Sequence, residues 1–255
     1  MFGNIFRQMP PVTKNLLIIN TVLWMAMAFF PSLDSWLTVN CGLYYAESDG
    51  FHIWQPFTYM FLHANFGHLF FNMFALLMFG GIIEWTLGSR RFLFYYLSCG
   101  IGAALIQEGV FALMAIRYHE IFDPAQIQTI IDSSWQVFLH GSVNVPLDVY
   151  QLMNDPSAVK FSLMLCTPTI GASGAIFGIL LAFGMLYPNR EMYLMFIPVP
   201  IKAKWMVIGY GVLELLMGLG NVDTSVAHFA HLGGMIFGFM MLWYWKKKGD
   251  FSGWY

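Results

Sequence analysis

Residues 171–187 read GASGAIFGILLAFGMLY, and this stretch decides the class of fold. It lies within a longer run, from Phe161 to Asn189, that contains no Asp, Glu, Lys or Arg. A helix needs roughly 20 predominantly apolar residues to cross the hydrocarbon core of a bilayer. The stretch therefore predicts a transmembrane helix, and Gly174 and Gly178 give that helix a face suited to close packing.

The composition of the whole chain agrees with a membrane protein. Of its 255 residues, 58% are apolar and only 26 are charged (12 basic plus 14 acidic), whereas about 25% of the residues in a typical soluble domain are charged. The composition excludes a disordered chain, a secreted disulfide scaffold and a nucleic-acid-binding domain. It predicts an all-α, polytopic membrane protein.

The distribution of charge divides the chain into six predicted membrane spans. Four runs carry no charged residue, and two more carry a single acid each, Glu108 in one and Glu214 in the other. The first run begins too far from the N-terminus for a signal peptide, and five more follow it. The predicted spans are residues 15–31, 60–83, 92–116, 171–187, 203–220 and 225–245.

The basic residues predict the orientation of these spans. Ten of the twelve lie in connections on one side, and only Arg117 and Lys160 lie on the other. Cytoplasmic connections carry the excess of Lys and Arg, so both termini are predicted to be cytoplasmic. The ten residues are Arg7, Lys14, Arg90, Arg91, Arg190, Lys202, Lys204, Lys246, Lys247 and Lys248.

The outer side carries two long connections, residues 31–57 and 117–168. In the second, Asp123 followed by Pro124 is typical of a helix N-cap with proline in the first helical position, which predicts a short helix toward Leu139. The simplest interpretation of this extended outer loop is a capping or packing decoration. A lid that gates access for a substrate is the alternative.

Three polar residues fall at one predicted depth. His68 lies 16 residues before Glu84, Ser173 lies 17 before Arg190, and His231 lies 15 before Lys246. At 1.5 Å per residue, they stand about 24, about 26 and about 23 Å above the inner boundary. Ionisable groups inside a bilayer are costly, so each is a candidate functional residue.

Glycines accompany two of these residues. Gly174 and Gly178 form one GxxxG pair next to Ser173, and Gly234 and Gly238 form another that begins one turn after His231. Such pairs let two backbones approach closely in lipid. We therefore expect the Ser173 hydroxyl to lie within hydrogen-bond reach of the His231 imidazole.

This pairing predicts nucleophilic catalysis. A serine hydroxyl becomes nucleophilic when a neighbouring base takes its proton, and a neutral histidine can do so. Asn72, one turn after His68 on the same helix face, and His68 itself are candidate donors to an oxyanion, together with the backbone N–H of Ser173. Asp223 lies eight residues before His231, and no acid is evident in an orienting position, so a dyad is predicted instead of a triad.

At these residues the sequence resembles the rhomboid family of intramembrane serine proteases. The segment 171–178 (GASGAIFG) resembles the family's GxSG nucleophile motif, and residues 230–234 (AHLGG) resemble its catalytic-histidine helix. Residues 63–68 (HANFGH), with Asn72, resemble the segment that supplies oxyanion donors, and residues 80–89 resemble its inner turn. The resemblance covers all six predicted spans.

The resemblance implies a bacterial-type, six-helix bundle in which residues 1–255 form a single membrane domain in the bacterial cytoplasmic (inner) membrane. It implies a serine endopeptidase with Ser173 and His231 as catalytic residues and His68 and Asn72 as oxyanion donors. The expected partners are membrane lipid and transmembrane protein substrates, with no nucleic acid, metal or cofactor. The chain departs from the family at Trp54-Gln55, where Trp-Arg is frequent, which puts in doubt a structural contact of that arginine.

Some alternatives stay open at this level. His228 rivals His231, although the glycine spacing and the HLGG match favour His231. His228 and His231 could also bind a metal, but no carboxylate or thiolate is evident beside them. A non-enzymatic binder of membrane helices would tolerate loss of the Ser–His pair, and a transporter would need inverted repeats, which are not evident. Glu84 is predicted to pin the short inner loop together with Arg90 or Arg91.

Overall fold

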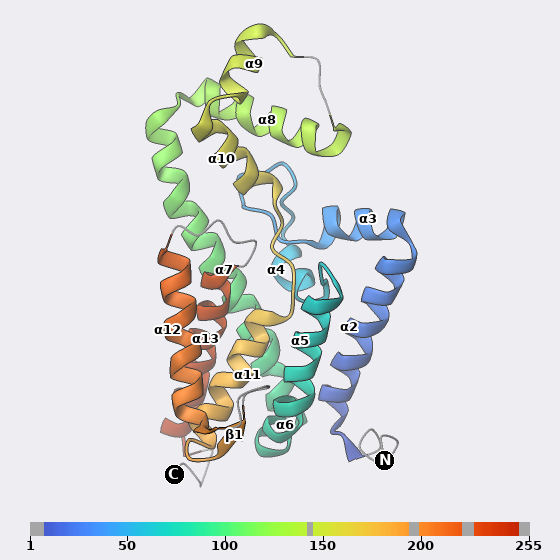
Figure 1. Cartoon of the computed structure of the whole chain (residues 1–255), viewed down its shortest axis with the longest axis vertical. Coiled ribbons are helices and arrows are strands. Elements are labelled where there is room, and N and C mark those ends of the chain that lie inside the picture. The colour runs from blue at the N-terminus through green and yellow to red at the C-terminus, as the bar shows by residue number, and fades with distance from the viewer. Residues whose placement is uncertain (1–7, 142–144, 194–198, 221–226, 250–255) are drawn as a thin grey trace.

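The computed structural model describes residues 8–141, 145–193, 199–220 and 227–249. In this part of the chain the fold is all-α apart from one short antiparallel hairpin, so the predicted class is confirmed. The start of α2 (Pro11–Phe29) and the end of α13 (His228–Lys247) lie at the same end of the bundle (Figure 1). The two ends of the chain lie on the same side of a bundle when the chain passes through it an even number of times.

Long and short helices and one hairpin lie between α2 and α13. In chain order they are α3 (Pro31–Cys41), α4 (Gln55–Thr58), the 3-10 turn η1 (Tyr59–Phe61), α5 (Phe66–Ala75), the π-helical segment η2 (Leu76–Gly80), α6 (Gly81–Leu87), α7 (Ser89–Ile121), α8 (Pro124–His140), α9 (Leu147–Met153), α10 (Pro156–Cys166), α11 (Ser173–Leu186), β1 (Glu191–Tyr193), β2 (Pro200–Lys202) and α12 (Ala203–Leu219). The β1–β2 hairpin, which the sequence does not predict, connects α11 to α12.

The predicted spans coincide with α2, α5 through α6, α7, α11, α12 and α13. By length and composition, three of the described helices could cross a membrane, namely α2, residues 66–87 and α7, and α11 is a shorter apolar helix. The second span begins at Phe66 instead of residue 60, because η1 is separate and the side chain of Asn65 caps α5 by accepting the His68 N–H at 2.9 Å. Residues 225 and 226 of the sixth span lie outside the described residues.

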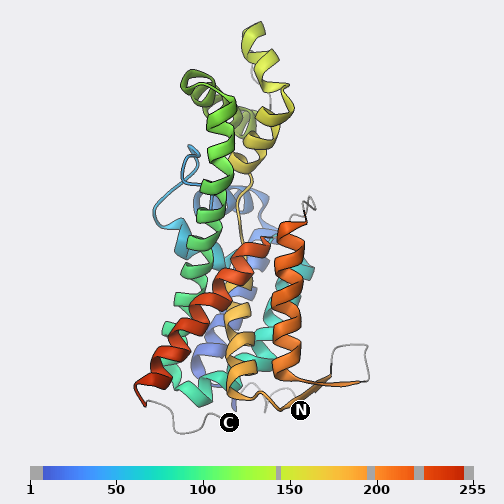
Figure 2. The ribbon, with the colours of Figure 1, turned by 90° about the vertical axis from the view of Figure 1, so that its left-hand side faces the viewer.

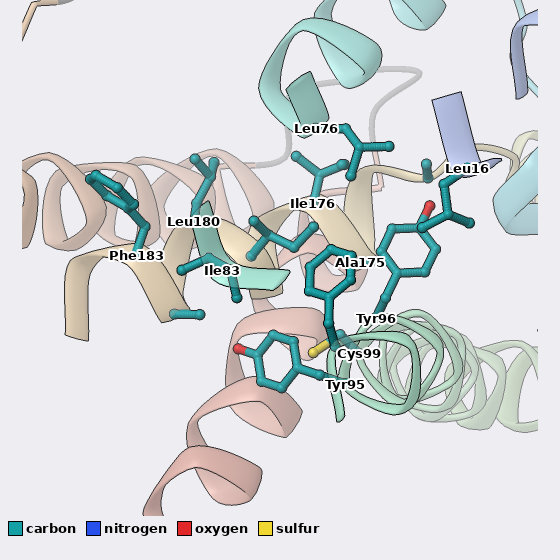
Figure 3. Close-up of a cluster of buried hydrophobic side chains, with 14 of the residues drawn as sticks. Leu16, Leu76, Ile83, Tyr95, Tyr96, Cys99, Ala175, Ile176, Leu180 and Phe183 are labelled. Atoms are coloured by element: carbon teal, nitrogen blue, oxygen red, sulfur yellow. The ribbon is translucent and has the colours of Figure 1, made fainter. Parts of the chain in front are cut away.

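The centre of the bundle is α11, which packs against α7, α12 and α13 (Figures 1 and 2). Tyr95, Tyr96 and Cys99 of α7 are fully buried in one hydrophobic cluster with Ile176 and Leu180 of α11 (Figure 3). The phenol of Tyr95 also donates a hydrogen bond to the carbonyl oxygen of Gly178 at 2.7 Å. Apolar packing and this bond fix α11 against α7.

Glycine contacts bring α11 and α13 together, as the GxxxG pairs predict. A Cβ at Gly234 would overlap the carbonyl oxygen of Gly174, and a Cβ at Gly178 would stand 3.2 Å from the carbonyl oxygen of Gly234. The backbones of the two helices therefore touch directly. Gly238 serves a different contact, because a Cβ there would overlap the Tyr95 hydroxyl of α7.

Glu84 joins the inner turn to the start of α2. Its carboxylate accepts the backbone N–H groups of Val12 and Thr13 at 3.0 and 2.7 Å, and the Thr13 hydroxyl at 2.8 Å. It also accepts the Ser89 hydroxyl at 2.7 Å, so Glu84 holds the inner loop through Ser89. The predicted pairing of Glu84 with Arg90 or Arg91 stays a prediction. An acid at a helix N-terminus satisfies N–H groups that have no partner within the helix.

The outer connections pack on each other beyond the bundle (Figure 1). The predicted helix at Asp123 is confirmed as α8, which begins with a capping box between Asp123 and Gln126. Trp135 of α8 packs edge-on against Tyr44 of the first connection, with ring centroids 5.3 Å apart.

Gln55 stands where the Trp-Arg pattern has an arginine. Its side chain is buried and joins two parts of the first outer connection to each other. Its amide accepts the Tyr44 N–H at 3.2 Å and donates to the Gly50 carbonyl at 2.8 Å.

Replacing Glu84 by alanine should destabilise the bundle. The variant loses the acceptor for two backbone N–H groups and two hydroxyls, which should lower the free energy of unfolding by about 2–3 kcal/mol. Denaturation in detergent micelles measures the change. Glu191→Ala, at an exposed position in β1, is the control, and equal stability of both variants would contradict the anchoring role.

Candidate active site

The segment that carries Ser173 is held by three backbone hydrogen bonds before α11 begins. Thr169 forms an isolated antiparallel bridge with Leu43, with N–O distances of 2.8 and 3.0 Å. The N–H of Gly171 donates to the carbonyl oxygen of Tyr59 at 2.9 Å. These contacts fix the approach of the chain, and Ser173 follows as the first residue of α11.

Gly171 meets two separate requirements. Its φ of +131° is a conformation that residues with a side chain rarely adopt. A Cβ at this position would also stand 2.6 Å from the Cε1 and Nε2 atoms of His68 and 3.7 Å from Oγ of Ser173. The His68 ring therefore lies against the turn that presents Ser173.

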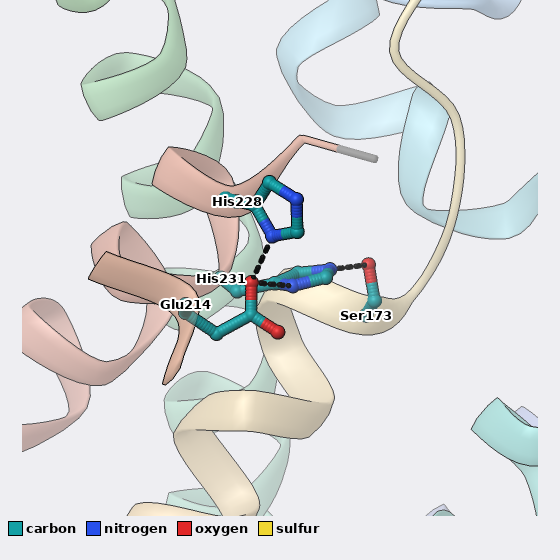
Figure 4. A network of polar contacts seen from close by, with 4 residues as sticks. All are labelled: Ser173, Glu214, His228 and His231. Carbon is teal, nitrogen blue, oxygen red and sulfur yellow. Dashed lines mark hydrogen bonds and ion pairs between the residues drawn. The ribbon is translucent and has the colours of Figure 1, made fainter. Parts of the chain in front are cut away.

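Ser173 and His231 are in direct contact. Oγ of Ser173 lies 2.8 Å from Nε2 of His231 (Figure 4). The imidazole stacks on the ring of Phe177, with centroids 4.2 Å apart and planes at 6°. The structure thus brings the two side chains within hydrogen-bond reach as the sequence predicts, and their catalytic roles stay a prediction.

A carboxylate lies on the other side of His231, which the sequence analysis did not anticipate. Oε2 of Glu214, on α12, is 2.9 Å from Nδ1 of His231 and 2.6 Å from Nδ1 of His228 (Figure 4). The contact with His231 is close but less well aligned than a hydrogen bond. The expectation that no acid lies in a position to orient His231 is therefore wrong. Asp223, the acid considered from the sequence, lies outside the described residues.

The sequence did contain a signal for Glu214. It is the single acid in an otherwise apolar span, and such a residue is a functional candidate by default. Twelve residues separate it from Lys202 at the start of α12, which places its Cα about 18 Å above the inner boundary. This is about one helical turn from the depth of His231, a difference that a glutamate side chain can bridge.

His68 and Asn72 both lie on α5, and the His68 ring stands against Gly171, two residues before Ser173. Among the described residues, Nδ2 of Asn72 is buried without a hydrogen-bond partner. His63 packs edge-on against His68, with centroids 5.1 Å apart. The N–H groups in the first turn of α11 add further donors at the positive end of the helix dipole. An unpartnered amide is suited to a ligand that carries negative charge, and the oxyanion roles stay a prediction.

Glu214, His228 and His231 also offer three ligand atoms within 4.8 Å of one another, enough to consider a metal ion. The expectation that no carboxylate lies beside the two histidines is therefore wrong. Two ligands of a tetrahedral zinc ion lie about 3.3 Å apart when the bonds are about 2.05 Å. The observed separations of 2.6 and 2.9 Å are shorter and fit hydrogen bonding better.

This arrangement can activate a serine. With a proton on Nδ1, His231 has a lone pair on Nε2 that can accept the Ser173 proton. Phe177 holds the ring plane, and Glu214 faces the opposite nitrogen. The chemistry that follows is attack of Oγ on an electrophilic carbon, with the proton passing to Nε2.

The Rhomboid domain family model matches residues 50–118 and 129–248. The chain is similar to Rhomboid protein 1, mitochondrial, of Saccharomyces cerevisiae, with 27% identity over 187 residues, covering 73% of this chain and 40% of the relative. It is 30% identical over 196 residues to RHOMBOID-like protein 12, mitochondrial, of Arabidopsis thaliana, covering 76% of this chain and 46% of the relative. It is 25% identical over 235 residues to Rhomboid protease AarA of Providencia stuartii, covering 89% of this chain and 69% of the relative. The chain thus spans less than half the length of the two mitochondrial relatives.

Gly171→Ala should lower the reactivity of Ser173 toward a fluorophosphonate. The added Cβ meets the His68 ring and strains a backbone with positive φ, so Oγ is displaced and labelling should slow about 10- to 100-fold. Gly141→Ala is a matched control, because Gly141 also has positive φ but ends α8. Mass spectrometry measures the rate of labelling. Equal labelling rates in the two variants would contradict the role of the turn.

Proposed function

The chain belongs to the rhomboid family, and we propose on that basis that it is a serine endopeptidase that hydrolyses peptide bonds in transmembrane segments of other proteins. The single observation that carries the proposal is the 2.8 Å contact between Ser173 Oγ and His231 Nε2 in a bundle of apolar helices. The similarity to AarA of Providencia stuartii, a relative named as a rhomboid protease, supports the same activity.

The first half of the proposed reaction cleaves the peptide bond. Oγ of Ser173 attacks the scissile carbonyl carbon while its proton passes to Nε2 of His231, which becomes an imidazolium. The tetrahedral intermediate then collapses, the carbon–nitrogen bond breaks, and Nε2 gives its proton to the leaving amine. The products of this half are an acyl ester on Ser173 and the released amine fragment.

The second half removes the acyl group. A water molecule gives a proton to Nε2 of His231 and attacks the ester carbon with its oxygen. The bond between that carbon and Oγ then breaks, and Oγ recovers the proton from Nε2. The acid fragment leaves, and both side chains return to their starting protonation.

Negative charge develops on the carbonyl oxygen in both halves. The unpartnered amide of Asn72, the His68 ring beside Gly171 and the N–H groups at the start of α11 are the proposed donors. Donors that are fixed before the reaction need no reorganisation as the charge appears. The lone amide of Asn72 is the strongest support for this part of the proposal.

The proposed setting is a single membrane domain over residues 1–255 in a bacterial cytoplasmic (inner) membrane. The excess of basic residues at one end of the bundle supports cytoplasmic termini. The partners are lipid and transmembrane protein substrates. With this orientation, Ser173 begins α11 in the outer half of the membrane, and cleavage takes place toward the outer end of the substrate helix.

Ser173→Ala should abolish cleavage of a model transmembrane substrate. The purified protein in detergent or liposomes should convert the substrate to two fragments that gel electrophoresis separates. Ser134→Ala, which removes a buried hydroxyl from α8, should cleave normally. Equal cleavage by the Ser173→Ala protein would reject Ser173 as the nucleophile, whereas no cleavage by either protein would favour a non-enzymatic binder.

Asn72→Ala should lower turnover with little effect on folding. Loss of one oxyanion donor reduces kcat by about 10²–10³, whereas the amide nitrogen of Asn72 makes no hydrogen bond to the described residues that folding would lose. Initial rates give kcat, and the thermal unfolding midpoint monitors the fold. Wild-type kcat in this variant would exclude Asn72 from the oxyanion site.

A further inference from the structure

We propose that Glu214 is a positioning residue that holds His231 ready for catalysis, and that His228 holds Glu214 in turn. The inference rests on the proposed function, because it requires Ser173 and His231 to be the reacting pair. It adds two residues to that pair, so that four side chains form one chain of contacts from α11 through α13 to α12 (Figure 4).

The backbone of α12 is built to place this carboxylate. Gly211, Glu214 and Gly218 lie on one face of the helix, because they are three and four residues apart. A Cβ at Gly218 would stand 3.1 Å from the Phe229 ring and 3.4 Å from Cβ of His228. The glycine therefore lets the first turn of α13 come close to α12 just beyond Glu214.

One oxygen of Glu214 serves both rings. Oε2 lies 2.6 Å from Nδ1 of His228 and 2.9 Å from Nδ1 of His231, and all three side chains are buried. An ionised carboxylate is only an acceptor, so each ring faces it with an Nδ1–H. This tautomer of His231 leaves the lone pair on Nε2, the atom that faces Ser173.

The carboxylate also acts on the charge that appears during the reaction. When His231 accepts the serine proton it becomes a cation with little access to water, and a neighbouring anion stabilises that cation. The His228 contact, at 2.6 Å, keeps the carboxylate in place. The less well aligned contact with His231 is typical of a catalytic hydrogen bond before substrate binds.

A purely structural role for Glu214 predicts a different outcome from a positioning role. Glutamine has nearly the same shape and can still bond to one ring, but it carries no charge. If Glu214 only fills space and joins α12 to α13, Glu214→Gln should keep normal kcat. If it stabilises the His231 cation, the same variant should fold normally and turn over slowly.

Kinetic measurements on Glu214→Gln separate these outcomes. With the model transmembrane substrate, kcat should fall about 10- to 100-fold, less than the loss from Ser173→Ala, while KM stays within about twofold. Glu214→Asp, which keeps the charge, should recover part of kcat. His228→Asn should lower kcat less than Glu214→Gln, because His231 and the carboxylate both remain.

The matched control is Glu108→Gln. Glu108 is the single acid of the predicted span 92–116 on α7, and its carboxylate accepts the Ala46 N–H at 2.9 Å in the outer connection. This variant should keep wild-type kcat. The thermal unfolding midpoints of all variants show whether a loss of activity reflects misfolding. An equal loss of kcat in Glu214→Gln and in Glu108→Gln would overturn the proposal.

Three further outcomes are decisive. Wild-type kcat in Glu214→Gln, with Ser173→Ala inactive, would overturn the role of Glu214 and leave the proposed protease intact. Full cleavage by Ser173→Ala would instead reject Ser173 as the nucleophile. Activity that a chelator removes and zinc restores would also overturn the positioning role, because Glu214, His228 and His231 would then be metal ligands.

Discussion

The fold depends on the direct contact between the backbones of α11 and α13. Gly234 lies against the carbonyl of Gly174, and Gly178 lies near the carbonyl of Gly234, so neither helix has room for a side chain at the crossing. Ser173 precedes the first of these glycines by one residue, and His231 precedes Gly234 by three. The crossing therefore fixes the 2.8 Å separation between hydroxyl and imidazole. In a membrane, where lipid is as apolar as leucine, such close packing replaces the hydrophobic effect as the force between helices.

Two buried carboxylates of this bundle are partnered by groups from other helices. Glu84 binds the first turn of α2 at the inner end, and Glu214 joins two histidines beside Ser173. A buried charge is tolerated where hydrogen bonds compensate its lost hydration. The amide nitrogen of Asn72 differs, because it is one of several buried polar atoms with which no described group pairs. The first two arrangements stabilise the resting protein, and the third is suited to a charge that exists only during a reaction.

Depth along each helix was predictable, because the charged residues at the inner ends give a fixed origin and the helical rise is constant. The same counting applied to Glu214 would have placed it within one turn of His231. It could not show which face of α12 turns toward α13, because the hydrophobic residues surround that helix and leave no clear polar stripe. The face is selected by Gly211 and Gly218, whose neighbours become visible only when the helices are packed. For the same reason, the sequence predicted the α8 helix from its N-cap but not the contact of Trp135 with Tyr44.

The sequence by itself determined the all-α class, the positions of six helices within a few residues, and the contact of Ser173 with His231, because charge spacing and glycine pairs are local features of the chain. The tertiary structure decided which third residue faces His231, how Gly171 brings His68 against the nucleophile turn, and how Glu84 closes the inner end on α2. These contacts join residues between 17 and 103 positions apart. The rotation of each helix about its axis sets them, and that rotation results from packing among all the helices together.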